Sequence, residues 1–318
     1  MNGIENKKRE KLNVRSISSV LGLIFTILLF LVWTRGSIAR VSNLEVIVNQ
    51  AYNIILIGVG AIFVFAYGGL DFSFGALIAA CTLVITLLTR AGYPFWIAIL
   101  ASVLLGAFSG YLIGALSQYL RIPVFIVSLS FEYIWRGVTE LGCATSLLYA
   151  PSEFTSLFNS WGIRIPVLLV FFVVFYLLYN KTRIGKYLRA AGGNMTAASL
   201  SGVKVSRYAI LAHVFAGICV GATAVFSLAR ATCAIATTGN GLEMDVLIGL
   251  VLGGMAMGGG AGCKFSSILI GAFTQAILSN GLILVGMNQY WVEGISGAIF
   301  IVVVALSLKR AGRGKGSR

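Results

Sequence analysis

Ten long apolar segments constrain this chain more than any other feature of its sequence. They cover most of the 318 residues, at 17–34, 46–67, 73–89, 94–119, 123–141, 163–180, 207–229, 244–259, 264–286 and 291–308. A transmembrane helix needs about 20 mostly apolar residues, and a chain with 11% charged residues lacks the polar cover of a soluble protein. We therefore expect an all-α, polytopic integral membrane protein with about ten transmembrane helices. Eight or nine is the alternative, because the runs 73–89 and 244–259 are short and contain or follow glycine breaks.

The positive charges predict how these helices are oriented. If the N-terminus is cytoplasmic and ten spans follow, 18 lysines and arginines lie on the cytoplasmic side and five lie outside. This bias follows the positive-inside rule, so we expect both termini in the cytoplasm. It also accounts for the net charge of +14 without a nucleic-acid partner.

The same boundaries divide the chain into a membrane domain with two basic ends. We expect a basic cytoplasmic N-terminus at 1–16, a membrane domain at 17–308 that begins with an uncleaved first span, and a basic cytoplasmic tail at 309–318. Two hydrophilic stretches interrupt the membrane domain. The stretch 142–162 is expected outside, with a short amphipathic helix at 152–159, and 181–206 is the largest internal cytoplasmic loop.

Glycines recur at four-residue intervals within several apolar runs. The spaced sets are Gly106, Gly110 and Gly114; Gly217 and Gly221; Gly249 and Gly253; and Gly254, Gly258 and Gly262. Small residues at this spacing let helices approach closely in lipid. We expect tight helix packing at these positions; the alternative is a backbone that also lines a solute path.

Three charged residues in the fifth apolar run form a pattern of their own. Glu132, Arg136 and Glu140 are four residues apart, so they share one helix face. Ionisable residues inside a span are candidates for function. An ion-paired stripe with a structural role is the first interpretation, since pairing avoids a lone charge in lipid; the second is a polar path.

The other intramembrane ionisable residues give weaker signals. Asp71, Glu243, Asp245 and Glu293 lie near the ends of apolar runs, where we expect solvated carboxylates. The single histidine, His213, lies inside an apolar run, and we expect it to be packed and hydrogen-bonded rather than a metal ligand.

A glycine-rich stretch at 258–267, GGGAGCKFSS, superficially resembles a phosphate-binding loop. Lys264 follows Cys263 instead of glycine, and Phe265 replaces the hydroxyl residue that would bind magnesium. We therefore expect no ATP, metal or other cofactor in this chain, and energy for transport would have to come from a partner.

The cytoplasmic loop carries the signals of a short capped helix. Asn194 is a favourable N-cap, and Gly202 suits the left-handed position beyond a helix end. We expect about two helical turns between them, which could dock a cytoplasmic partner.

Several strings together resemble one family. They are YGGLDFSFGALIAACTLV (67–84), RIPVFIVSLSFEYIWRGVT (121–139), WGIRIPVLLV (161–170), TRIGKYLRAAGGNMTAASLSGVKV (182–205) and the glycine-rich segment 239–286. In this order and spacing they are similar to the permeases of bacterial monosaccharide ABC importers, the ribose-permease-like group, over nearly the whole chain after residue 45.

The resemblance implies a permease subunit in the bacterial cytoplasmic (inner) membrane. Its implied partners are the lipid bilayer, a second permease subunit (identical or a paralogue), two ATPase subunits that bind ATP and Mg²⁺, an extracytoplasmic solute-binding protein and a small solute, with a monosaccharide first. The implied ATPase-coupling residues are Gly192, Gly193, Asn194, Ala197, Ala198, Leu200 and Gly202. The implied residues of the path or core are Gly68, Gly69, Asp71, Ser73, Glu132, Arg136, Gly253 and Gly254.

Two other classes of function stay open on the residues alone. A secondary transporter would carry its own coupling-ion site near the bilayer midplane, and a membrane enzyme would need a catalytic constellation, for which this chain has few candidate residues. Within the resembled family, nucleosides or branched-chain amino acids are the alternative solutes.

Overall fold

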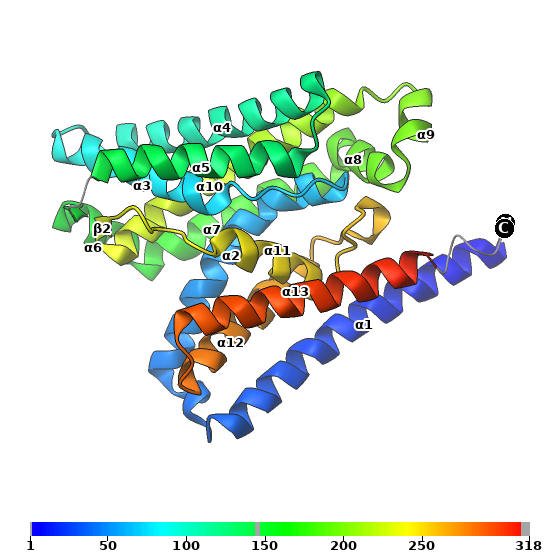
Figure 1. Cartoon of the computed structure of the whole chain (residues 1–318), viewed down its shortest axis with the longest axis horizontal. Coiled ribbons are helices and arrows are strands. Elements are labelled where there is room, and N and C mark those ends of the chain that lie inside the picture. The colour runs from blue at the N-terminus through cyan, green and yellow to red at the C-terminus, as the bar shows by residue number, and fades with distance from the viewer. Residues whose placement is uncertain (1, 144–146, 313–318) are drawn as a thin grey trace.

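The fold is a bundle of α-helices with one small strand pair (Figure 1). The computed structural model describes residues 2–143 and 147–312, so the end of the basic tail and part of the 142–162 loop lie outside the described residues. The helices are α1 Asn2–Trp33, α2 Val41–Ala66, α3 Phe74–Arg90, α4 Phe95–Leu120, α5 Val124–Cys143, α6 Ser152–Asn159, α7 Trp161–Lys181, α8 Arg183–Gly193, α9 Met195–Leu200, α10 Val205–Ala231, α11 Leu242–Leu252, α12 Ser267–Leu284 and α13 Gln289–Gly312. The strands β1 Leu148–Tyr149 and β2 Cys233–Ala234 pair antiparallel.

Each of the ten apolar runs contains a helix, but the helices differ in length and polarity. Five in the described part of the chain are long and apolar enough to cross a membrane: α2, α4, α7, α10 and α12. Shorter apolar helices cover Ser18–Trp33 and α3. The expected helix at 244–259 is wrong in its extent, because α11 ends at Leu252 and the chain turns there at Gly253 and Gly254. At 1.5 Å per residue, α11 is roughly 16 Å long, about half of the hydrocarbon core.

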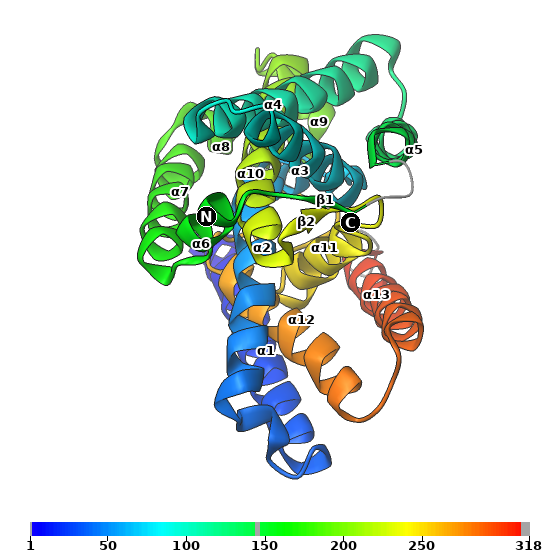
Figure 2. The same cartoon turned by 90° about the vertical axis from the view of Figure 1, so that its left-hand side faces the viewer.

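Helices α2 and α10 form the centre of the bundle, since most of their residues are buried, whereas few residues of α7 are buried. Helices α5 and α13 lie on one side of the molecule (Figure 2). The N-terminal end of α1 and the last turns of α13 lie at the same end as α8 and α9 (Figure 1). The described ends of α1 and α13 therefore lie on the same side as the loop 181–206, and the cytoplasmic location of the termini stays a prediction.

The glycine spacing correctly predicts close helix packing for the sets in α4, α10 and α11, but it is wrong for Gly254, Gly258 and Gly262, which lie outside any α-helix, after the end of α11. A Cβ atom at Gly106 of α4 would lie 2.1 Å from the carbonyl oxygen of Gly217 in α10, and one at Gly110 would lie 2.1 Å from the carbonyl oxygen of His213. In the same way, a Cβ at Gly271 of α12 would lie 1.7 Å from the carbonyl oxygen of Gly249 in α11. Backbone therefore touches backbone at two helix crossings, and any side chain there would separate them.

The loop 181–206 is more ordered than the sequence predicts. Helix α8 occupies 183–193, where we expected no helix, and it buries Leu188 and Ala191 on its inner side. Helix α9 follows, as the caps predict. The short helix expected outside at 152–159 is confirmed as α6, which buries Phe154.

Candidate functional site

The N-terminal turns of α3 and α11 meet inside the bundle. Each helix follows a non-helical segment, 67–73 before α3 and 235–241 before α11. Gly75, in the first turn of α3, lies so close to α11 that a Cβ there would be 2.1 Å from Glu243 Oε2 and 2.3 Å from the carbonyl oxygen of Gly239. Only glycine fits at this junction. We call the contact of Gly75, Gly239 and Glu243 the central junction.

Helix α5 is hydrogen-bonded to both non-helical segments. The hydroxyl of Ser128 accepts a hydrogen bond from the backbone N–H of Phe72 at 3.1 Å. The guanidinium of Arg136, through Nη1, donates to the carbonyl oxygens of Ala236 at 2.7 Å and Thr238 at 3.0 Å. Arg136 thus positions the segment that leads into α11.

The expected ion-paired stripe on α5 is wrong. Arg136 donates to carbonyl oxygens, and within the described residues no salt bridge joins it to Glu132 or Glu140. Glu140 is exposed. Two backbone oxygens accept the hydrogen bonds of Arg136 Nη1 in place of a carboxylate, and the polar path stays the other interpretation.

Glu243 brings a carboxylate into the central junction. Its Oε2 is buried and has no hydrogen-bond partner among the described residues, and Glu132 and Arg136 lie close enough to interact with it electrostatically. A buried polar atom without a partner is costly. The sequence placed Glu243 at a solvated helix end, whereas the residue is half-buried and its Oε2 is shielded from solvent. The atom is suited to accept a hydrogen bond from a hydroxyl group.

A second polar cluster surrounds His213 of α10. Its Nδ1 lies 2.8 Å from Asp71 Oδ2 and its Nε2 lies 2.8 Å from the hydroxyl of Tyr67. Asp71 Oδ1 accepts hydrogen bonds from the Ser73 backbone N–H at 3.0 Å and hydroxyl at 2.6 Å. Asp71 is 3% exposed and His213 is 0% exposed. The packed, hydrogen-bonded histidine is confirmed, whereas the solvated Asp71 is wrong.

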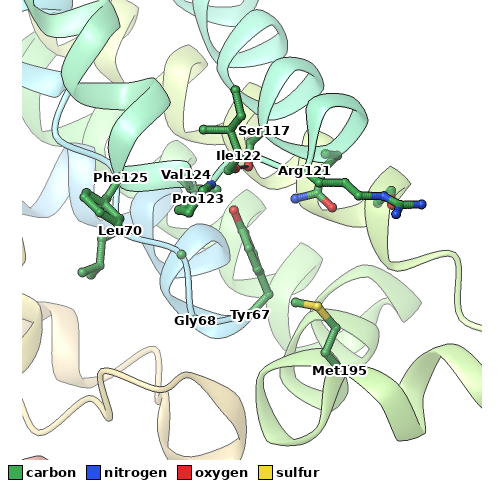
Figure 3. Close-up of a pocket in the computed structure, with 13 residues that line it drawn as sticks. Tyr67, Gly68, Leu70, Ser117, Arg121, Ile122, Pro123, Val124, Phe125 and Met195 are labelled. Carbon is green, nitrogen blue, oxygen red and sulfur yellow. Dashed lines mark hydrogen bonds between the residues drawn. The ribbon is translucent and has the colours of Figure 1, made fainter.

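A pocket of about 540 Å³ lies where segment 67–73 begins (Figure 3). Tyr67, Gly68, Gly69 and Leu70 line one side; the turn between α4 and α5 lines another, and Met195 of α9 also contributes. The Arg121 guanidinium points away from Tyr67 (Figure 3). Gly68 has a φ of +92°, a conformation that glycine adopts readily.

Two of the residues proposed for the path or core have structural roles, one in helix packing and one in a turn. A Cβ at Gly253 would lie 2.0 Å from the carbonyl oxygen of Ser267 in α12, and Gly254 forms the turn after α11 with a φ of +92°. They lie in neither polar cluster and serve the core.

The expected ATPase-coupling residues, between 192 and 202, form a coupling segment with an exposed and an internal part. The Asn194 side chain caps α9 by accepting a hydrogen bond from the Ala197 backbone N–H at 2.9 Å, and Gly202 has a φ of +82°. Ala197 is exposed and Leu200 is 86% exposed. Ala198, in contrast, is buried, so it is not available to a docking partner as the sequence suggested.

The glycines before α9 also differ from one another. A Cβ at Gly192 would lie 2.1 Å from the carbonyl oxygen of Ala66 and 2.5 Å from the backbone nitrogen of Gly260, whereas one at Gly193 would meet no described atom within 4 Å. Gly192 therefore anchors α8 within the chain, and Gly193 faces open space.

The comparison with protein families shows to which family the chain belongs. Residues 43–304 match the family described as the branched-chain amino acid transport system / permease component. The chain belongs to this family. It is a helical membrane permease of a transport system.

Similar proteins cover most of the chain. It is 30% identical to the D-allose transport system permease protein AlsC of Escherichia coli K12 over 293 residues, which are 89% of this chain and 90% of AlsC. It is 30% identical to the ribose import permease protein RbsC of the same strain, over 85% of this chain and 87% of RbsC. The autoinducer 2 import system permease protein LsrD of Klebsiella pneumoniae is also 30% identical to this chain, over 85% of this chain and 86% of LsrD. No solved structure matches the chain.

Sequence reasoning missed Tyr67, Gly75 and Glu243 as site residues, and it did not pair His213 with Asp71. The available signal was that His213 and Asp71 are ionisable residues near or inside apolar runs, where each needs a partner. No local pattern says which partner that is.

Proposed function

We propose that this chain is the transmembrane subunit of an ATP-binding-cassette importer for a small, hydroxyl-rich solute of the monosaccharide class. The permeases for D-allose and ribose that resemble it over most of its length support this solute class. In this proposal the subunit resides in the bacterial cytoplasmic membrane and is not an enzyme. Separate ATPase subunits bind ATP and Mg²⁺, and an external binding protein delivers the solute.

The observation that carries the proposed path is the buried Glu243 oxygen without a partner at the central junction. Carboxylates accept hydrogen bonds from hydroxyl groups, which a sugar presents on every side. Glu132 and Arg136 lie in the same neighbourhood, so the path would offer both acceptors and a donor. We place the path beside α5, where these side chains are only half-buried.

The side that carries α5 and α13 (Figure 2) suits a second permease subunit. Helix α5 exposes large apolar residues there, with Leu141 86% and Ile134 51% exposed, and α13 exposes Ile301 at 68% and Val302 at 57%. A second permease subunit facing this side would enclose the polar residues of α5 between the two subunits. This arrangement supports a dimer, which the path requires for closure.

The positive-inside bias orients α8, α9 and both termini toward the cytoplasm in this proposal. The exposed face of α9, with Ala197 and Leu200, then docks the ATPase subunit. Helix α6 and the β1–β2 pair lie at the opposite end (Figure 1), where the solute-binding protein would dock.

The experiment reconstitutes this permease in proteoliposomes with the ATPase and binding protein from its gene neighbourhood. We expect uptake of labelled D-ribose or D-allose that requires ATP, the ATPase and the binding protein. Glu243→Gln should reduce uptake at least tenfold, whereas the matched change Glu45→Gln, at an exposed position on α2, should leave it unchanged. Uptake driven by a proton or sodium gradient without the ATPase would refute the proposal and favour a secondary transporter.

A further inference from the structure

Segment 67–73 lies between two polar regions that the proposed path would connect. Its first residues, Tyr67 to Leu70, line the 540 Å³ pocket beside α9. Its last residue precedes α3, whose Gly75 touches Glu243 in the central junction. A solute that left the central junction toward α9 would therefore meet this segment.

A single imidazole links the beginning of the segment to a residue near its end. His213 contacts Tyr67 at the beginning of the segment and Asp71 near its end, each at 2.8 Å. Ser128 of α5 adds one hydrogen bond to the Phe72 backbone. Gly68 and Gly69 provide no side chains between these points, and the tie through His213 is the side-chain hydrogen bonding that links Tyr67 to Asp71.

We propose that the hydrogen-bonded chain Tyr67–His213–Asp71 is a latch that holds segment 67–73 as the gate of the permease on the side of the ATPase. The three side chains are positioning residues, because they fix the backbone of the segment rather than touch the solute. The proposal rests on the proposed path through the central junction.

The two halves of the latch contact the helices that precede and follow α9 in the chain. Gly192 of α8 abuts the carbonyl oxygen of Ala66, the residue before Tyr67, and a Cβ at Gly259 would also lie 2.6 Å from that oxygen. His213 is carried by α10, which follows α9 after a short turn. A displacement of α8 relative to α10 would therefore change the distance between the Tyr67 hydroxyl and the His213 ring, and an ATPase docked on α9 could open the latch in this way.

The test measures how accessible the segment is from the side of α9. Phe72→Cys, in a background with the five native cysteines replaced, is labelled with a charged, membrane-impermeant thiol reagent in inverted vesicles. Tyr67→Phe removes one hydroxyl and Asp71→Asn removes one charge, and both preserve shape. The matched control is Tyr52→Phe, which removes a buried hydroxyl that donates to the Arg164 carbonyl oxygen at 3.1 Å outside the latch.

We expect Tyr67→Phe and Asp71→Asn to raise the labelling rate roughly five- to tenfold, as the loss of one buried hydrogen bond predicts, and Tyr52→Phe to leave it unchanged. In the assembled complex, both latch variants should also raise ATP hydrolysis in the absence of the binding protein. Labelling rates and ATP hydrolysis equal to those of the control would overturn the latch, even if the variants were less stable to heat. The labelling rate does not depend on the solute. An uptake assay in which Glu243→Gln had no effect would therefore contradict the proposed path without changing the result of the labelling test.

Discussion

The contact between Gly106 of α4 and Gly217 of α10 offers the sharpest test of the packing. A Cβ at Gly106 would lie 2.1 Å from the Gly217 carbonyl oxygen and 2.9 Å from its carbonyl carbon. These are backbone atoms, so no rotamer change can relieve the clash. To restore an ordinary contact of 3.4 Å, the two helices would have to move about 1.3 Å apart, which would disturb the close packing along their interface.

We expect Gly106→Ala and Gly217→Ala each to destabilise the protein by about 1–3 kcal/mol, the usual cost of overpacking. The double variant should cost less than the two single costs added together, because the first methyl group already separates the helices. The assay is thermal unfolding in detergent, followed by tryptophan fluorescence. The control is Gly22→Ala on α1, where a Cβ would meet no described atom within 4 Å. If the Gly106 and Gly217 variants melted at the same temperature as the control, α4 and α10 would not cross at backbone contact.

Two further predictions concern α5 and the coupling segment. Arg136→Ala should lower folded yield and uptake more than Glu140→Ala, because Arg136 binds two carbonyl oxygens whereas Glu140 is exposed; equal yields measured by fluorescence size-exclusion would contradict this. Gly202→Val should weaken co-purification with the ATPase, because a side chain at a φ of +82° costs roughly 1–2 kcal/mol in backbone strain and distorts the end of α9. Ala197→Trp should do the same by steric clash with the ATPase, and undiminished co-purification of both variants would show that α9 is not the contact.

Local signals in the sequence predicted most of the elements but few of their partners. The apolar runs located the helices because length and hydropathy are local properties, and Asn194 and Gly202 located α9 because caps act within one turn. Glycine spacing showed which faces pack closely. Helix α8 was not predicted because the charged residues of 183–193 interrupt its apolar pattern and its buried side is narrow.

The polar clusters could not be predicted because their members are far apart in the chain. His213 and Asp71 are separated by 142 residues, and Gly75 and Glu243 belong to different helices. A lone sequence indicates that an intramembrane carboxylate needs a partner, but several donors satisfy that need equally well. Arg136 shows the same limit, since backbone carbonyl oxygens replaced the carboxylates that its helical spacing suggested.

The meeting of two helix N-termini has an electrostatic consequence for the proposed path. Each N-terminus is equivalent to roughly half a positive elementary charge, so α3 and α11 together place about one positive charge at the central junction. An ionised Glu243, in the first turn of α11 and against Gly75 of α3, offsets that charge. Glu132 and Arg136 nearby also cancel each other. The path would therefore present closely spaced dipoles and opposite charges, a field that can orient an uncharged polyol as it passes.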